Sequence, residues 1–125
     1  MVNSKLVLTA NTVLGVFGMG WLIAPEALGK YWRIAPGANL DYMGHRYGAL
    51  LIGIAVTVWL ARDALNTRAR RALMIGTLVA MALTTALSLY GALTLDLNAW
   101  APFVTELVLS SGLAWVLFIE AEPLV

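Results

Sequence analysis

The uncharged stretch from Tyr47 to Ala61 limits the folds that are open to this chain. A helix needs about 20 residues to cross the hydrocarbon core of a bilayer, and this stretch is shorter than that. A spanning helix in this region must therefore begin earlier and include His45 and Arg46. Arg46 then lies about one turn inside the membrane boundary, where a charged side chain needs a partner or a path to water.

The composition is that of a membrane protein. Of the 125 residues, 61% are hydrophobic and 12% are charged, and the mean hydropathy is +0.82, whereas a soluble domain has about 45–50% apolar and about 25% charged residues. The net charge of +1 offers no basic surface for phosphates, which argues against nucleic acid as a partner. Because the chain has no cysteine and one histidine, we expect neither a metal site nor a bound cofactor.

Four apolar runs have the length of a spanning helix. The predicted helices cover about residues 5–24, 40–62, 71–94 and 99–119. After the first run, Pro25 beside Glu26 is typical of a helix start, and Tyr31 with Trp32 favours a short helix at the membrane interface. The sequence therefore predicts an all-α four-helix transmembrane bundle, with a short interfacial helix after helix one, as a single domain over residues 1–125.

Basic residues are concentrated on one side of the predicted membrane. Four spans place both termini and the 62–71 connection on the same side, which holds Lys5, Arg62, Arg68, Arg70 and Arg71. The opposite side holds Lys30, Arg33 and Arg46. Because Lys and Arg accumulate in cytoplasmic segments, we expect both termini in the cytoplasm of a bacterial inner membrane.

Two opposite charges lie at similar predicted depths in the outer half of the bundle. At about 1.5 Å per residue, Arg46 is roughly 7 Å and Glu106 roughly 10 Å from the outer ends of their helices. Each alone would cost about 2.5–3.5 kcal/mol if it were central. The sequence therefore predicts that Arg46 and Glu106 form either a structural ion pair or the polar floor of an outward-facing pocket. A proton-binding role for Glu106 is a further alternative.

Further polar side chains complete two predicted layers. His45 and Tyr90 belong to the outer layer and are candidate pocket residues beside Arg46 and Glu106. A lone histidine is more typical of an interfacial position than of a metal or haem ligand. The inner layer takes one polar side chain from each of three helices, namely Asn11, Thr57 and Thr77.

Small residues recur at helical spacing and predict close helix contacts, because small side chains let helices approach in lipid. The third predicted helix carries them at every fourth position, at Gly76, Ala80, Thr84 and Ser88. The second begins with a G-x-x-x-G pair, Gly44 and Gly48. Association between copies of the chain is the alternative use of these patterns.

Four short motifs carry a family likeness. They are Ala24-Pro25-Glu26-Ala27-Leu28, Arg46-Tyr47-Gly48-Ala49 with Gly53, Arg70-Arg71, and Glu106-Leu107-Val108. In these motifs the chain resembles small, uncharacterised four-helix membrane proteins of bacteria. The resemblance spans nearly the whole chain and implies the same fold, with no established activity. The small multidrug transporters are similar in size, but their essential membrane glutamate lies in the first helix, where this chain has Asn11 and no acid.

The small size and the absence of a catalytic set favour a non-enzymatic accessory or scaffold subunit of a larger membrane complex. Within the lipid bilayer, its expected partners are other membrane subunits or further copies of the chain. The alternative is a binder or transporter of a small amphipathic or lipid-like molecule that uses the outer pocket. A third hypothesis is a membrane enzyme acting on a lipid or sterol, with Glu106 or His45 as acid or base.

Overall fold

The computed structural model describes residues 3–120 and 123–125, and it contains helices and no strands in these ranges. The helices are α1 Ser4–Asn11, α2 Leu14–Ile23, α3 Pro25–Tyr31, α4 Ala38–Ala61, α5 Arg68–Thr94 and α6 Trp100–Ala114, followed by the π-helical turn η1 at Trp115–Ile119. The predicted all-α class is therefore confirmed.

Four helical segments of the described chain are long and apolar enough to cross a membrane. They are Ser4–Ile23, which comprises α1 and α2, Ala38–Ala61, Arg68–Thr94 and Trp100–Ile119. The second and third begin at Ala38 and Arg68, earlier than the predicted starts at residues 40 and 71. For α5 the reason is a side-chain cap, because the Thr67 hydroxyl accepts a hydrogen bond from the Arg70 amide at 3.2 Å.

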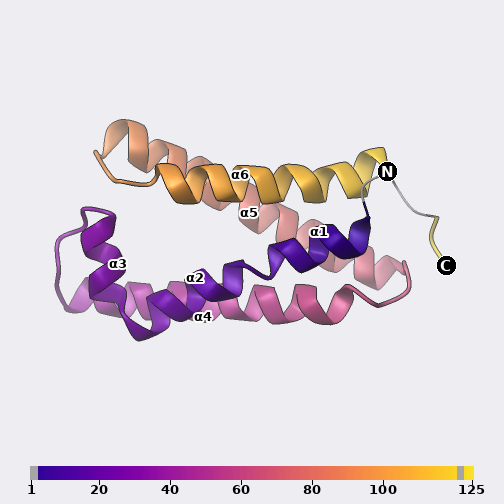
Figure 1. The fold of residues 1–125 in the computed structure, drawn as a ribbon, viewed down its shortest axis with the longest axis horizontal. Helices are drawn as coiled ribbons and strands as arrows, with labels where there is room; N and C mark the ends of the chain where they lie inside the picture. Colours follow the sequence, from indigo (N-terminus) through magenta and orange to yellow (C-terminus); the bar gives the residue numbers. More distant parts are fainter. Residues whose placement is uncertain (1–2, 121–122) are drawn as a thin grey trace.

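The spans form two closely packed pairs. α4 packs mainly on α2, and α5 packs mainly on α6, whereas α4 and α5 contact each other much less. α1 bridges the pairs, because it contacts both α4 and α6. α3 and the α5–α6 connection lie at one end of the bundle, here named the α3 end (Figure 1). The α4–α5 connection and the described chain ends lie at the other, the terminal end (Figure 1).

Glycines bring α2 and α4 into backbone contact. A Cβ added at Gly48 would lie 2.5 Å from the Gly18 carbonyl oxygen and 2.8 Å from the Leu22 amide nitrogen. A Cβ at Gly44 would lie 2.8 Å from Pro25. The predicted close contact at Gly44 and Gly48 is therefore confirmed, and its partner is the end of the first span.

The buried face of α5 differs from the predicted stripe of small residues. The buried positions are Arg70, Met74, Thr77, Met81, Thr85, Ser88 and Gly91. The prediction was right for Ser88 and wrong for Gly76, which is exposed and where a Cβ would meet nothing within 4 Å. A strict four-residue spacing drifts around a helix of 3.6 residues per turn, whereas mixed spacings of three and four stay on one face.

α3 is a short helix at the predicted place, with proline at its first position. It packs on the start of α4, where Gly29 lies against Leu40. Trp32 at its end is half-buried and meets Trp21 edge-on, with 5.4 Å between the ring centroids. Trp32 therefore packs against the bundle, and the placement of α3 at a membrane interface stays a prediction.

The larger apolar cluster joins the spans towards the terminal end. It consists of Val7, Leu8, Val58, Met74, Leu113, Val116 and Leu117. A smaller cluster of Leu14, Leu51 and Met81 lies between it and the α3 end. Because these clusters hold the spans together, polar side chains and a cavity can occupy the α3 end.

Candidate functional site

Glu106 is an ionisable side chain inside the bundle, with 5% of its surface exposed. It lies six residues after Trp100, the start of α6, or roughly 9 Å into the helix at about 1.5 Å per residue. Ser88 of α5 donates a hydrogen bond to its Oε2 at 3.0 Å, and Tyr47 of α4 donates one to its Oε1 at 3.4 Å. Glu106 therefore joins three spans at one level.

Hydrogen bonds offset the cost of burying this carboxylate. An ionised side chain at the centre of a bilayer costs about 2.5–3.5 kcal/mol on insertion scales. A hydrogen bond to a charged group contributes about 1.5–3 kcal/mol, so the 3.0 Å bond from Ser88 and the longer one from Tyr47 reduce this cost. The hydroxyl groups of Ser88 and Tyr47 can thus hold Glu106 without a cation.

The helical repeat of α4 directs Tyr47 towards Glu106. Gly44, Gly48 and Leu51 form the buried face of this part of α4, and Tyr47 falls within the same three- and four-residue spacing. Its ring meets the buried Trp21 edge-on, with 5.9 Å between centroids. This aromatic contact orients the Tyr47 ring, and the hydroxyl group at its tip reaches the carboxylate.

The predicted ion pair between Arg46 and Glu106 is absent from the described residues, so this prediction is wrong. Arg46 is exposed; it donates a hydrogen bond to the Tyr42 hydroxyl at 3.2 Å and lies 5.7 Å from the centroid of that ring. At about 100° per residue, Arg46 is roughly 200° around the helix from both Gly44 and Gly48. Because these glycines must face α2, Arg46 points away from the bundle.

His45 and Tyr90 also lie outside the site. Both side chains are exposed on the outer surface of the bundle, and neither lines the cavity at the α3 end. The prediction that they form a pocket with Glu106 is therefore wrong. Of the four outer-layer residues, Glu106 alone has the predicted position inside the bundle.

A cavity of about 300 Å³ lies beside the Glu106 network, between α4 and α5. Its lining consists of Trp21, Trp32, Ile34, Leu40, Met43, Gly44, Tyr47, Thr84, Leu87, Ser88, Gly91, Leu97 and Ala99. The lining side chains are apolar or aromatic except for Tyr47, Thr84 and Ser88, which we name the hydroxyl end. Glu106 lies directly behind it, because two of these hydroxyl groups donate to its carboxylate.

The cavity opens sideways from the bundle. Met43 of α4 and Leu87 of α5 line it, and both are exposed. The opening therefore lies between two spans, where α4 and α5 make few contacts. Trp32 and Leu97 belong to the α3 end of the lining, and the Asn98 amide bonds to the Trp32 carbonyl oxygen at 3.2 Å. This contact ties the α5–α6 connection to α3 over the cavity.

The predicted inner polar layer does not form a network. Thr57 and Thr77 each donate a hydrogen bond, 2.9 Å long, to a carbonyl group four residues earlier in their own helices. Asn11 likewise donates to Val7 of its own helix at 2.8 Å. The two threonine hydroxyl groups are thus satisfied locally, as is usual for threonine inside a helix, and within the described residues no hydrogen bond of these three side chains joins two helices.

The first span is interrupted at mid-length. α1 ends at Asn11 and α2 begins at Leu14, and the amides of Thr12 and Val13 bond to carbonyl groups three residues back, as in a 3₁₀ turn. The Asn11 side chain is fully buried, and its Oδ1 has no hydrogen-bond partner among the described residues. The polar residue predicted on the first helix thus marks a change of helix geometry.

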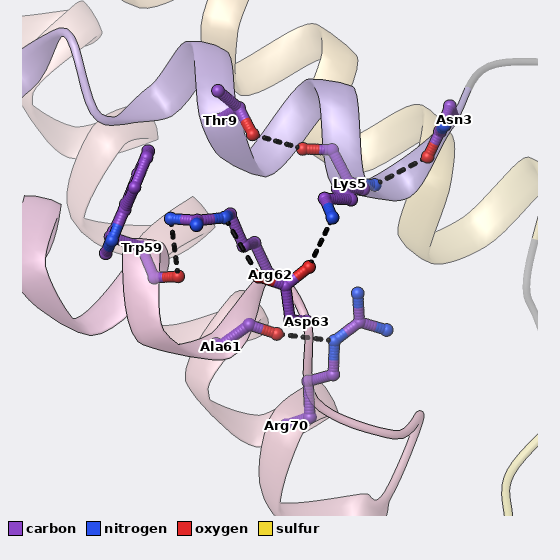
Figure 2. Close-up of polar contacts among 8 residues, drawn as sticks. All are labelled: Asn3, Lys5, Thr9, Trp59, Ala61, Arg62, Asp63 and Arg70. Carbon is purple, nitrogen blue, oxygen red and sulfur yellow. Dashed lines mark hydrogen bonds and ion pairs between the residues drawn. The ribbon is translucent and has the colours of Figure 1, made fainter.

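Charged side chains at the terminal end tie α1 to the α4–α5 connection. Figure 2 shows Asp63 between Lys5 and Arg62, with which it forms ion pairs. The Arg62 guanidinium lies over the Trp59 ring, 3.1 Å from its centroid, and Arg70 donates to a carbonyl oxygen at the end of α4. The hydrogen bond from Lys5 lowers the pKa of Asp63 below its ordinary value.

Three site residues were not predicted for this role: Trp21, Trp32 and Tyr47. Trp32 was expected in a short helix at the membrane interface, a usual place for tryptophan in a membrane protein. Tyr47 had a usable signal, because it falls on the face marked by Gly44 and Gly48. Nothing local in the sequence indicates the inward turn of Trp32, since its position depends on where α3 packs.

Neither the family models, the curated proteins nor the solved structures match this chain. The resemblance to small four-helix membrane proteins of bacteria therefore stays a prediction. The chemistry of the cavity and of Glu106 is the basis from which a function has to be inferred.

Proposed function

We propose that this chain is an integral protein of a bacterial inner membrane that binds a small amphipathic molecule in the cavity between α4 and α5. The cavity of about 300 Å³, with apolar walls and a hydroxyl end backed by Glu106, carries this proposal. Small-molecule sites are typically about 300–1,000 Å³, mostly apolar, with a few placed polar groups. The apolar body of the ligand would contact the walls, and its polar head the hydroxyl end.

The side opening supports entry of the ligand from the bilayer. Met43 and Leu87 are apolar, exposed and part of the lining, so an amphipathic molecule dissolved in the membrane would reach the cavity without crossing water. Transfer of 2-naphthalenemethanol, an uncharged amphipathic probe, from buffer to the protein in phosphatidylcholine nanodiscs measures such binding by isothermal titration calorimetry, with empty nanodiscs as the reference. We expect saturable binding to the native chain.

Two matched variants on α5 separate binding in the cavity from partition into lipid. Leu87→Trp places a larger side chain at the opening and should weaken binding at least ~10-fold, a loss of about 1.4 kcal/mol. Leu83→Trp is the control, because Leu83 is equally exposed one turn away and does not line the cavity. Unsaturable transfer, or equal effects of the two variants, would contradict the proposal.

Both termini are proposed to face the cytoplasm, which places the cavity in the outer half of the membrane. The support is the basic terminal end, with Lys5, Arg62, Arg68, Arg70 and Arg71, because cytoplasmic segments are enriched in such residues. A reporter that is active only in the cytoplasm should work when fused after Val125 and fail when inserted at Asn98. The reverse pattern would overturn this orientation.

The accessory-subunit hypothesis is the second candidate, and a different surface favours it. A shallow groove of about 370 Å³ lies between α2 and α4, lined by small residues such as Gly15 and Ala55 and by exposed apolar side chains such as Val16, Val56 and Leu60. A helix of another subunit could pack there through small residues. Extraction in a mild detergent should then yield a stoichiometric partner, whereas the chain alone would contradict this candidate.

A further inference from the structure

The hydroxyl end of the cavity offers hydrogen-bond acceptors to a ligand, because its three hydroxyl groups already donate their hydrogens to other groups of the protein. Tyr47 and Ser88 donate to Glu106, and Thr84 donates to the Met81 carbonyl oxygen at 3.0 Å. A hydroxyl group has one hydrogen to donate and keeps lone pairs that can accept. A ligand head group that meets these three oxygens therefore gains most when it carries N–H or O–H donors.

The Glu106 carboxyl group lies behind the hydroxyl end and can carry a negative charge. Both oxygens of Glu106 accept hydrogen bonds, and such bonds favour the ionised form of the carboxyl group, whereas burial opposes it. No ion pair to Glu106 occurs within the described residues, and no residue of the cavity lining is charged. A positive head group in the cavity would favour the ionised form of Glu106, and the two charges would attract each other strongly in a medium of low dielectric constant.

The aromatic residues of the cavity lining also favour a ligand with a positive head group. Trp21, Trp32 and Tyr47 all line the cavity, and the two edge-on contacts of Trp21 hold these rings together. The faces of aromatic rings attract cations, and tryptophan does so best. Apolar walls, aromatic faces, acceptor oxygens and a carboxylate behind them thus point to one chemical class.

We infer that the ligand of this cavity is a hydrophobic organic ammonium ion, whose N–H groups bond to the hydroxyl oxygens of Tyr47 and Ser88 in the field of Glu106. This inference rests on the proposed function, since it names the class of molecule that the cavity binds. An anionic head group would meet a carboxylate and no cation. A lipid whose headgroup joins an ammonium to a phosphate is disfavoured for the same reason, because the lining offers the phosphate no charged partner.

Three probes that share the same apolar group and differ in the charge of the head group test the charge preference of the cavity. 2-Naphthylmethylamine, 2-naphthalenemethanol and 2-naphthoate share a naphthalene ring and at neutral pH carry a positive, a neutral and a negative head group. Binding is measured in phosphatidylcholine nanodiscs, whose surface has no net charge. The native chain should bind the amine at least ~10-fold more tightly than the alcohol, because charge-assisted hydrogen bonds are roughly twice as strong as neutral ones, and should bind the naphthoate most weakly.

Glu106→Gln removes the charge and keeps the size of the side chain. In this variant the amine should lose its advantage and bind within ~3-fold of the alcohol. Tyr47→Phe provides a second test if Glu106→Gln does not fold, because it removes one acceptor oxygen and leaves the carboxylate. It should lower the ratio of amine to alcohol affinity by at least ~3-fold, since a hydrogen bond to a charged group is worth more than one to a neutral group.

The outcomes distinguish the inference from the proposed function. Saturable binding that Leu87→Trp weakens, but without preference for the amine, would overturn the inference and leave the proposed function intact. An amine preference that survives both Glu106→Gln and Tyr47→Phe would also overturn it. Absence of saturable binding for all three probes would contradict the proposed function itself.

Discussion

α4 packs on both α2 and α5, and these two interfaces are built on opposite principles. Against α2, Gly18 and Gly48 bring backbone to backbone and Gly44 lies against the Trp21 ring, with no space for even one added carbon at any of the three. Against α5, contacts are few, and larger side chains such as Tyr47 and Leu87 surround a cavity of about 300 Å³. The polar groups that reach Glu106 lie along this second interface, which is where a ligand can be accommodated.

The comparison shows how one helix can be both fixed and available for binding. In lipid no hydrophobic force drives helices together, so close packing of small residues supplies the attraction. The α2–α4 interface therefore holds α4 in place, and the α4–α5 interface does not need to be tightly packed. The following predictions test this division of roles, in order of decreasing effect.

Gly48→Ala should have the largest effect. The added Cβ would lie 2.5 Å from a backbone oxygen and 2.8 Å from a backbone nitrogen of α2, and backbone atoms cannot move aside without separating the helices. We expect a loss of about 3 kcal/mol of unfolding free energy, the upper part of the usual cost of overpacking, measured by thermal or denaturant unfolding in detergent.

Gly53→Ala is the matched control, because it makes the same change on the same helix. A Cβ at Gly53 would meet nothing within 4 Å, and alanine favours the helix over glycine by about 0.5–1 kcal/mol. This variant should therefore be slightly stabilised. Destabilisation of both variants by the same amount would show that the α2–α4 interface is not specifically tight.

Ser88 and Glu106 should be energetically coupled across the α5–α6 pair. Their 3.0 Å hydrogen bond predicts that Ser88→Ala and Glu106→Gln together cost less than the sum of the single changes, by about 0.5–1.5 kcal/mol. Unfolding of the four proteins in one detergent measures the coupling. Arg46→Met is the control, because its effect should add to that of Glu106→Gln within about 0.5 kcal/mol. Coupling to Arg46 instead would restore the ion pair that the sequence suggested.

The inner polar residues should behave independently of one another. Thr57 and Thr77 each donate within their own helix, so replacing either by valine removes one local hydrogen bond and no link between helices. We expect losses of about 0.6 kcal/mol or less for each change, the average for such bonds in a membrane protein, and additivity in the double variant. A coupling energy as large as that of Ser88 and Glu106 would contradict this expectation.

The smallest expected effect is a pH dependence at the terminal end. The pKa of Asp63 is lowered in the folded chain, first by the hydrogen bond from Lys5. A lowered pKa means that the stabilising contribution is present above the ordinary pKa of aspartate, about 4, and is lost as the pH falls through the folded value. Melting temperatures between neutral and acidic pH should fall less steeply for Asp63→Asn than for the native chain. Identical slopes would show that the Lys5–Asp63 pair does not act in solution.

The sequence predicted only part of the candidate site, and there is a physical reason why the rest could not be predicted. Glu106 is recognisable because a charge in an apolar run must be satisfied inside the bundle. Arg46 fulfils the same criterion, yet it lies on the outer surface, where it contacts Tyr42. The difference depends on which side of α4 packs against α2, and the sequence predicted both a close contact at Gly44 and Gly48 and an inward-facing Arg46, which lie on opposite sides of α4.

The sequence by itself determined the features that depend on residues close together in the chain. The length and apolarity of the runs define the four candidate spans, Pro25 marks the start of α3, and Gly44 with Gly48 marks a close contact. The tertiary structure decided that Tyr47 and Ser88, rather than Arg46, satisfy Glu106, and that Trp21 and Trp32 enclose a cavity. These features join residues far apart in the chain, so they depend on which helix faces pack together, and helical periodicity alone does not specify that choice.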